Sequence, residues 1–265
     1  MTEPETPKQT GPAFFDPAWL RRLTRFLDTG TGKRTLTTTA IGCLLLSPFV
    51  VFSLPLAPLA LVSLLAFSYL SRRRLARAVA RLPLGPRTTL AVLIVVMGLV
   101  RELIIWSAEY GQGDGYVLTW HAQLIPDLLI GMGIYGAWAL GWALSLRWFR
   151  YRLAEVLLIQ ALYGLVIEQF GQNLLDGLAA MPLGLLLWLL AMMLSAAPVG
   201  VAWILAGDKL RTLPGSGLDN SFRYAAPPLL ISAAVVAIFA VWAQVLEYFQ
   251  AIPKPAAPIR QRPFW

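Results

Sequence analysis

The chain is dominated by long apolar tracts, and this feature restricts its fold more than any other. The tracts lie at 36–54, 56–71, 88–107, 121–146, 153–170, 178–206 and 225–248. A helix needs about 20 apolar residues to cross the hydrocarbon layer, and most of the tracts approach or exceed that length. Only 14% of the residues are charged, against about 25% in soluble domains. The sequence therefore predicts an all-α fold, a polytopic membrane helix bundle of about seven transmembrane helices.

The first two tracts are contiguous, and we expect them to form a tight hairpin. Pro55 and Pro58 lie at the junction, and proline breaks a helix because it lacks the N–H donor. Both halves are short, so a re-entrant pair that enters the membrane without crossing it is the alternative. Either version returns the chain to the same side of the membrane. The chain then divides into an N-terminal segment 1–35, a helix bundle 36–248 and a Pro-rich tail 249–265.

Positive charge is sorted along the chain in a way that predicts orientation. Eighteen of the 22 Lys and Arg residues lie in the N-terminal segment and in the connections 72–87, 147–152 and 209–223. The hairpin turn and the connections 108–120 and 171–177 contain none. Because positively charged connections stay in the cytoplasm, we predict a multi-pass protein of the cell (inner) membrane with a cytoplasmic N-terminus. Seven crossings then place the tail outside, which conflicts with its Lys254, Arg260 and Arg262.

Two basic segments, 16–30 and 72–82, are expected to form amphipathic helices in the plane of the membrane surface. In each segment apolar residues recur at helical spacing among arginines, and such helices attach to anionic lipid headgroups. A solvated basic linker is the alternative. The basic residues flank apolar spans, so membrane lipids rather than nucleic acid are the predicted partners, despite a pI near 10.0. The prolines of the tail predict an extended, poorly ordered segment.

Acidic and amide side chains recur at helical spacing inside the apolar tracts. An ionisable group costs about 2.5–3.5 kcal/mol at the centre of a membrane helix, so it usually faces a cavity or a partner. The stripes are Gly98, Glu102, Ile105 and Glu109 in the third tract; Gln123, Asp127, Gly131 and Tyr135, with His121 beside them, in the fourth; Gln160, Gly164, Glu168 and Gln172 in the fifth; and Gln244 and Glu247 in the seventh. By the predicted topology, Glu102, Asp127, Glu168 and Glu247 all lie in the outward-facing half of the bundle.

Arg101 is the one cation inside these tracts. Its neighbour Glu102 is rotated about 100° away on a helix, so we expect Arg101 to pair across spans with Asp127 or Glu168. Two carboxylates would then lack a cation, and would be protonated, hydrated or occupied by a bound cation.

Each polar residue also has a simpler structural interpretation. Asp127 follows Pro126 and fits the first turn of a helix, and Glu168 fits a helix end that meets water. His121 beside Trp120 fits an interfacial aromatic pair. Glu109 is expected in a solvated connection, and Glu155 in a surface ion pair with the arginines of 147–152.

No motif in the sequence names a reaction or a cargo, and three classes of function remain. The first is a noncatalytic subunit or assembly component of a membrane system, in which the polar stripes hold helices together and protein partners dock. The second is an intramembrane enzyme that acts on a lipid or isoprenoid-like substrate. The third is a proton- or cation-coupled transporter.

For the second and third classes, the candidate catalytic residues are Glu102, Asp127 and Glu168, with His121 as a proton relay. These carboxylates would act as acid–base groups or as oxygen ligands of Mg²⁺, Ca²⁺ or Mn²⁺. The candidate binding residues are Arg101, Gln123, Gln160, Gln172 and Glu247. With one cysteine, Cys43, and one histidine, Cys-rich and His-rich metal centres are excluded, and the sequence assigns no cofactor.

Overall fold

The computed structural model of the protein describes residues 56–112, 119–213, 222–252, 260–261 and 263–264. Regular structure in this part of the chain is entirely helical, which confirms the all-α helix bundle. In chain order the elements are α3 (Leu56–Leu70), α4 (Arg72–Ala80), α5 (Pro86–Gln112), α6 (Leu124–Ser145), α7 (Leu153–Val166), the short 3₁₀ helix η1 (Glu168–Gly171), α8 (Gln172–Ala179), α9 (Gly184–Leu210) and α10 (Phe222–Tyr248).

Within the described residues, four helices are long and apolar enough to cross a membrane. They are the spans Pro86–Gly111, Leu124–Ser145, Gly184–Leu210 and Phe222–Tyr248, in α5, α6, α9 and α10. Two further apolar helices, α3 and α7, are shorter, with 15 and 14 residues. The chain is therefore a helical membrane protein. The predicted tract 36–54 and the predicted helix 16–30 lie outside the described residues, so the total of seven crossings stays a prediction.

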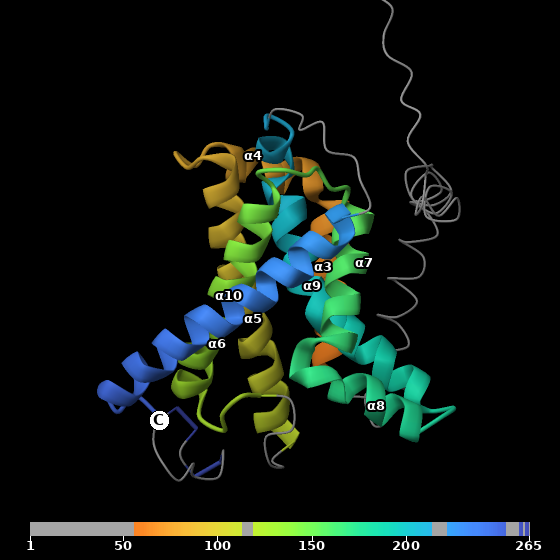
Figure 1. Cartoon of the computed structure of the whole chain (residues 1–265), viewed down its shortest axis with the longest axis vertical. Helices are drawn as coiled ribbons and strands as arrows, with labels where there is room; N and C mark the ends of the chain where they lie inside the picture. Colours follow the sequence, from red (N-terminus) through yellow and green to blue (C-terminus); the bar gives the residue numbers. More distant parts are fainter. Residues whose placement is uncertain (1–55, 113–118, 214–221, 253–259, 262, 265) are drawn as a thin grey trace, which may run out of the picture.

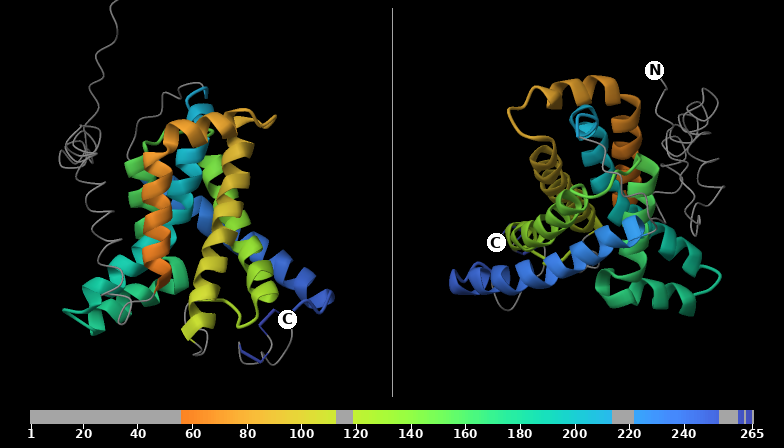
Figure 2. Two further views of the ribbon diagram at one scale, coloured as in Figure 1. Left: turned by 180° about the vertical axis from the view of Figure 1, so that it is seen from behind. Right: turned by 45° about the horizontal axis from the view of Figure 1, so that its top comes forward.

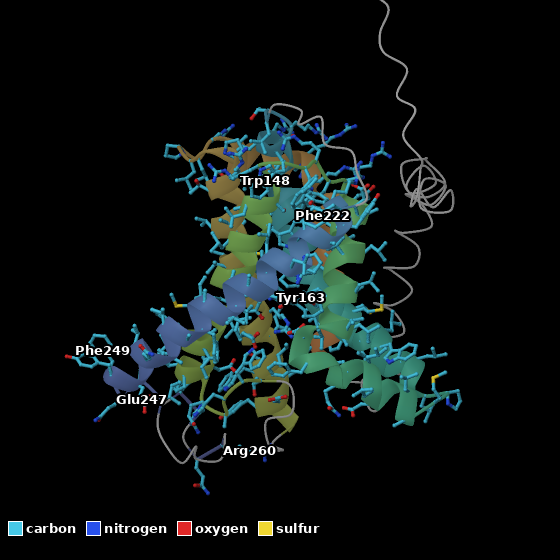
Figure 3. All side chains as sticks on the ribbon, viewed as in Figure 1. Trp148, Tyr163, Phe222, Glu247, Phe249 and Arg260 are labelled. Carbon is cyan, nitrogen blue, oxygen red and sulfur yellow. The ribbon has the colours of Figure 1, made fainter. Side chains whose placement is uncertain are left out.

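Successive long helices run in opposite directions, so their connections gather at two ends (Figure 1). One end carries α4, the connection 146–152, the end of α9 and the start of α10; we call it the arginine end. The other carries the end of α5, the start of α6, η1, α8 and the described residues of the C-terminal tail; we call it the tail end. The basic connections noted in the sequence fall at the first end, where nitrogen-bearing side chains cluster around α4 and Trp148 (Figure 3).

At the arginine end, α4 lies across the ends of the long helices, and its bounds agree with the amphipathic helix predicted at 72–82 (Figure 2). The connection after α4 is fastened to α9, because Lys209 Nζ donates to the carbonyl oxygens of Leu82 and Leu84 at 2.5 Å each. Arg73, Arg74 and Arg77 are exposed on α4, as expected of a helix at a membrane surface.

Glu155 is buried at this end, and the predicted surface ion pair with the neighbouring arginines is wrong. Its carboxylate accepts the Arg152 backbone N–H at 2.7 Å and so caps the first turn of α7. The cation that contacts it is Arg223 at the start of α10, and the Tyr224 hydroxyl lies 3.3 Å away. Glu155 therefore ties α7 to α10. The partner of Glu155 could not be predicted from its sequence neighbours, because Arg223 lies 68 residues later in the chain.

The fourth span, α6, lies at the centre of the bundle. Trp138, Trp142 and Tyr135 are almost fully buried, and α6 packs against both α5 and α10. A Cβ atom added at Gly133 would lie 2.5 Å from the Trp242 ring, and one at Gly141 would lie 2.5 Å from Ile231. Small residues on α6 therefore let α10 approach, as the glycine-rich sequence of this span suggests. α10 crosses α6 at a slant, as both views in Figure 2 show.

The fifth and sixth spans differ from their predicted bounds at the tail end. The predicted tract 153–170 ends as an α-helix at Val166, and the chain turns where Phe170 and Gly171 have positive φ values of 56° and 78°. The residues that follow form α8, and the next long helix begins only at Gly184. α8 extends outward from the bundle and is held to α9 by the Trp188 indole, which donates to the Leu174 carbonyl at 3.1 Å.

The described residues of the tail are packed against the bundle, in contrast to the poor order expected from its prolines. The carbonyl oxygens of Pro263 and Phe264 accept the backbone N–H groups of Leu124 and Ile125 at 2.9 and 3.1 Å. These donors belong to the first turn of α6, where a helix has no internal acceptor for them. The Phe264 ring also stacks on Trp106 at a centroid distance of 6.0 Å. The C-terminus thus caps the central span.

Candidate functional site

The polar stripes of α5 and α6 meet at an ion pair with a third hydrogen-bonding partner. Arg101 Nη1 donates to Glu102 Oε1 at 2.5 Å and to the Tyr135 hydroxyl oxygen at 2.6 Å. The Tyr135 hydroxyl in turn donates to the same Glu102 oxygen. All three residues are buried, with Glu102 and Tyr135 at 0% exposure. We call Arg101, Glu102 and Tyr135 the α5–α6 joint.

The partner expected for Arg101 is therefore wrong. We expected the guanidinium to pair with Asp127 or Glu168 from another span, but its ion pair is with the adjacent Glu102. The two side chains leave the helix in different directions, yet arginine is long enough to bend its guanidinium toward the neighbouring carboxylate. Asp127 and Glu168 are close enough to Arg101 and Glu102 for electrostatic interaction.

Two glycines create the space in which the joint forms. The Tyr135 ring occupies the volume that a side chain at Gly98 of α5 would need. On the facing helix, a Cβ at Gly131 would lie 3.3 Å from the Glu102 side chain. The Tyr135 ring of α6 thus packs over Gly98 of α5, and the Glu102 side chain of α5 packs over Gly131 of α6. Close helix approach of this kind is typical of small residues in membrane bundles.

Glu168 approaches the joint from η1, just after α7. A Cβ added at Gly164 of α7 would lie 3.2 Å from Glu168 Oε2 and 2.2 Å from the Cβ of Ser195, so the carboxylate lies beside Ser195 of α9. Unlike Glu102, Glu168 is partly exposed. Glu102, Asp127 and Glu168 thus come together at one level of the bundle, and Glu168 is the least buried of the three residues.

Asp127 stabilises the connection that leads into α6. Its Oδ1 accepts the backbone N–H groups of Trp120 and His121 at 2.7 and 3.0 Å. The His121 ring lies in the same turn, where Nδ1 accepts the Gln123 N–H at 3.1 Å. His121, Gln123 and Asp127 are all buried, so the three candidates of the fourth tract form one local hydrogen-bonded turn.

Glu109 closes the same connection from the other side, and its expected solvated position is wrong. The residue is 7% exposed, and its Oε2 accepts the Thr119 hydroxyl at 2.8 Å. Nearby, the Trp106 indole donates to the Ala122 carbonyl at 3.0 Å. One acceptor and one donor near the end of α5 therefore hold the far end of the connection, and a pattern of spans cannot predict these contacts.

Gln160 links three helices nearer the arginine end. Its side-chain oxygen accepts the Trp142 indole N–H of α6 at 2.9 Å, and its amide nitrogen lies 3.3 Å from the Ser195 hydroxyl of α9. Ser195 donates to the Gln160 backbone carbonyl at 3.1 Å. Gln160 and Ser195 are both at 0% exposure.

Two candidates lie away from this cluster. Gln172 is exposed in α8, where it donates to Asp176 at 2.6 Å. Glu247 is exposed near the end of α10 and lines a separate, mostly apolar cavity of about 620 Å³ with Trp242, Leu246 and Gln250. The structure does not bring Glu247 to the other carboxylates, because α10 slants away from α7 as it approaches the tail end (Figure 3).

Tyr135 and Ser195 are polar partners that the sequence analysis did not select as site residues. Tyr135 stands in the polar stripe of its span, eight residues after Asp127, and that position was a usable signal. Ser195 is a single hydroxyl among apolar residues of α9, so its role depends on which helix faces it.

The described residues include no group of three or more His, Cys, Asp or Glu placed to hold a metal ion. Within the same residues, Arg101 Nε, Glu102 Oε2 and Asp127 Oδ2 are buried and have no hydrogen-bond partner. These atoms can bind water or a polar group. The Glu102 carboxylate accepts hydrogen bonds from the Arg101 guanidinium and the Tyr135 phenol.

Comparisons with known proteins add no further assignment. No protein-family description matches the chain, no curated protein matches it, and no solved structure matches it.

Proposed function

We propose that the chain is a noncatalytic, multi-pass component of a membrane complex or of its assembly, held together internally by buried polar contacts between helices. The observation that carries the proposal is how the embedded polar groups are used. The α5–α6 joint, Gln160 with Ser195, and Asp127 with the turn at Trp120 all bond to neighbouring segments of the same chain. Interhelical hydrogen bonds in membranes contribute about 0.6 kcal/mol each on average.

The topology proposed for this component places the arginine end in the cytoplasm of the cell membrane, with a cytoplasmic N-terminus and seven crossings. The gathering of Arg-rich connections at one end of the bundle supports it, because positive connections are retained on the cytoplasmic side. The exposed arginines of α4 would then contact anionic lipid headgroups.

Protein partners are proposed to dock on α10. Large apolar side chains are exposed along this helix, among them Leu229, Val236, Phe239 and Val241. Only 17% of its most apolar window is buried within the chain. A helix that packs so little against its own bundle presents its surface to lipid and to neighbouring subunits.

The test compares a variant that removes one charge of the joint with a variant that removes both charges. Breaking a buried pair by removing one partner costs about 3–5 kcal/mol, whereas replacing both partners is often close to neutral. We therefore expect Glu102→Gln alone to lower the amount of protein in the membrane. The double variant Arg101→Met/Glu102→Gln should restore both the amount and the phenotype of the host cell. Normal amounts of the double variant with a lost phenotype would contradict a structural role.

A second candidate, an enzyme or a proton-coupled transporter, is favoured by one observation. Glu168 is a partly exposed residue whose carboxylate interacts electrostatically with Arg101 and Glu102 of the joint. Glu168→Gln keeps the shape of the side chain and removes its charge. The noncatalytic proposal expects this variant to behave as the wild type. Loss of phenotype at normal abundance would favour chemistry at Glu168, and a pH-driven ion flux into proteoliposomes, absent in the variant, would identify a transporter.

A further inference from the structure

Two arginines from different elements converge on one backbone carbonyl at the arginine end. Arg87, the second residue of α5, donates through Nη2 to the Leu146 oxygen at 3.4 Å. Arg150, in the connection between α6 and α7, donates through Nη1 to the same oxygen at 3.1 Å and to the Phe149 oxygen at 3.3 Å. The two guanidinium groups are therefore close to each other, because each donates to the same oxygen.

No carboxylate among the described residues forms an ion pair with either arginine. Glu155, the acid of this connection, is occupied by Arg223 and the Arg152 N–H, and Asp208 pairs with Arg211 at 3.6 Å. Two like charges this close repel each other. Partial burial lowers the pKa of the Arg150 guanidinium, and the charge of Arg87 lowers that pKa further.

Each of these two guanidinium groups also keeps an unused donor. Arg87 Nε and Arg150 Nε are buried, and neither has a hydrogen-bond partner within the described part of the chain. A pair of close cations with spare donors and no protein counter-charge has the composition of an anion site. Phosphate suits it best, because its oxygens accept two parallel N–H groups from one guanidinium.

We propose that Arg87 and Arg150 form a binding site for the phosphate of an anionic membrane phospholipid. A lipid source fits the position: Arg87 begins a membrane-spanning helix, and Trp148, 43% exposed, lies in the connection that carries Arg150. Tryptophan at this level is typical of the membrane interface. Basic pockets between helices at the cytoplasmic side bind anionic headgroups. This site is independent of the noncatalytic function proposed above.

The experiment counts lipids bound to the purified full-length protein in detergent by native mass spectrometry. Phosphatidylglycerol is added stepwise to the wild type, to Arg87→Gln/Arg150→Gln and to a matched control, Arg81→Gln/Arg147→Gln, whose two arginines lie outside α4. The control removes the same charge from exposed arginines at the same end. Because the charged hydrogen bonds to the phosphate are lost, the concentration of phosphatidylglycerol needed for half-saturation should rise roughly tenfold or more in the double variant. It should change less than about twofold in the control.

Two further additions identify the source of the phosphate. Zwitterionic phosphatidylcholine should bind the wild type less tightly than phosphatidylglycerol, and inorganic phosphate at equal concentration should not compete. If Arg87→Gln/Arg150→Gln does not yield folded protein, Arg150→Gln alone is measured and should show the same direction. Equal weakening in the control, or unchanged binding in the Arg87 and Arg150 variants, would overturn the site. Competition by inorganic phosphate at the lipid's own concentration would overturn the lipid assignment.

Discussion

Asp127 lies in the first turn of α6, and one of its oxygens accepts two backbone N–H groups of the preceding connection. These donors belong to Trp120 and His121. A buried donor that loses its acceptor costs about 1–3 kcal/mol. Asp127 therefore stabilises the connection that precedes α6.

We expect Asp127→Ala to lower the free energy of unfolding by about 2 kcal/mol, which corresponds to a melting temperature roughly 4–8 °C lower. The measurement is thermal unfolding in detergent. Asp176→Ala is the matched control, because Asp176 is exposed in α8 and bonds only to the exposed Gln172. Equal melting temperatures for Asp127→Ala and wild type would contradict the capping role.

At this scale the sequence predicted which residues are embedded better than it predicted what they contact. Helical spacing alone placed Gly98, Glu102, Ile105 and Glu109 on one face, and all four are buried. The partner of Arg101 could not be predicted in the same way, because it depends on how a long side chain bends. The roles of Tyr135 and Ser195 depend on which helices face each other, and a single sequence does not state this.

Both α5 and α10 pack against α6. The glycines of α6 do not contribute equally to this packing. Gly133 and Gly141 face α10 at a distance that leaves no room for a side chain, whereas a Cβ at Gly136 would meet nothing within 4 Å. The Trp242 indole also donates to the Leu129 carbonyl at 2.7 Å, which fixes α10 beside the first half of α6. The close approach of α10 to α6 thus depends on Gly133 and Gly141.

We expect Gly133→Val to separate α10 from α6, and Gly136→Ala to leave the contact unchanged. Overfilling a packed interface costs about 1–3 kcal/mol, and here the cost falls on the Trp242 contact. The measurement is a disulfide or chemical crosslink between cysteines introduced on α6 and α10 in each variant. A crosslink of wild-type yield in Gly133→Val would show that α10 is not positioned by this glycine.

Element boundaries were predicted well where a helix continues through apolar sequence and poorly where a backbone turn ends it. α5, α6 and α10 were each predicted to within a few residues. After α7 ends at Val166, the chain turns at Phe170, whose φ is positive, and a phenylalanine gives no sequence signal for that conformation. The packing of Pro263 and Phe264 against α6 is a long-range contact of the same unpredictable kind.

For the whole molecule, the decisive property is the separation of charge between its two ends. Arg74 is exposed in α4 at the arginine end, and Asp176 is exposed in α8 at the tail end. The proposed orientation puts the first in the cytoplasm and the second outside the cell.

We expect a cysteine at position 176 to react with a membrane-impermeant maleimide on intact cells, and a cysteine at position 74 to react only after the cells are permeabilised. The native Cys43 is first replaced by serine, so that each variant, Asp176→Cys or Arg74→Cys, carries one thiol. Labelling of position 74 on intact cells, with none at position 176, would reverse the orientation and place the carboxylates toward the cytoplasm.

The Tyr135 ring lies where position 98 has no side chain, and this has a consequence for how such chains diverge. A relative with alanine at 98 must carry something smaller than tyrosine at 135, and it then loses the hydroxyl that holds Arg101 and Glu102. Substitutions at 98, 101, 102 and 135 should therefore be correlated among relatives of this chain, whereas substitutions at the surrounding positions should be independent of them.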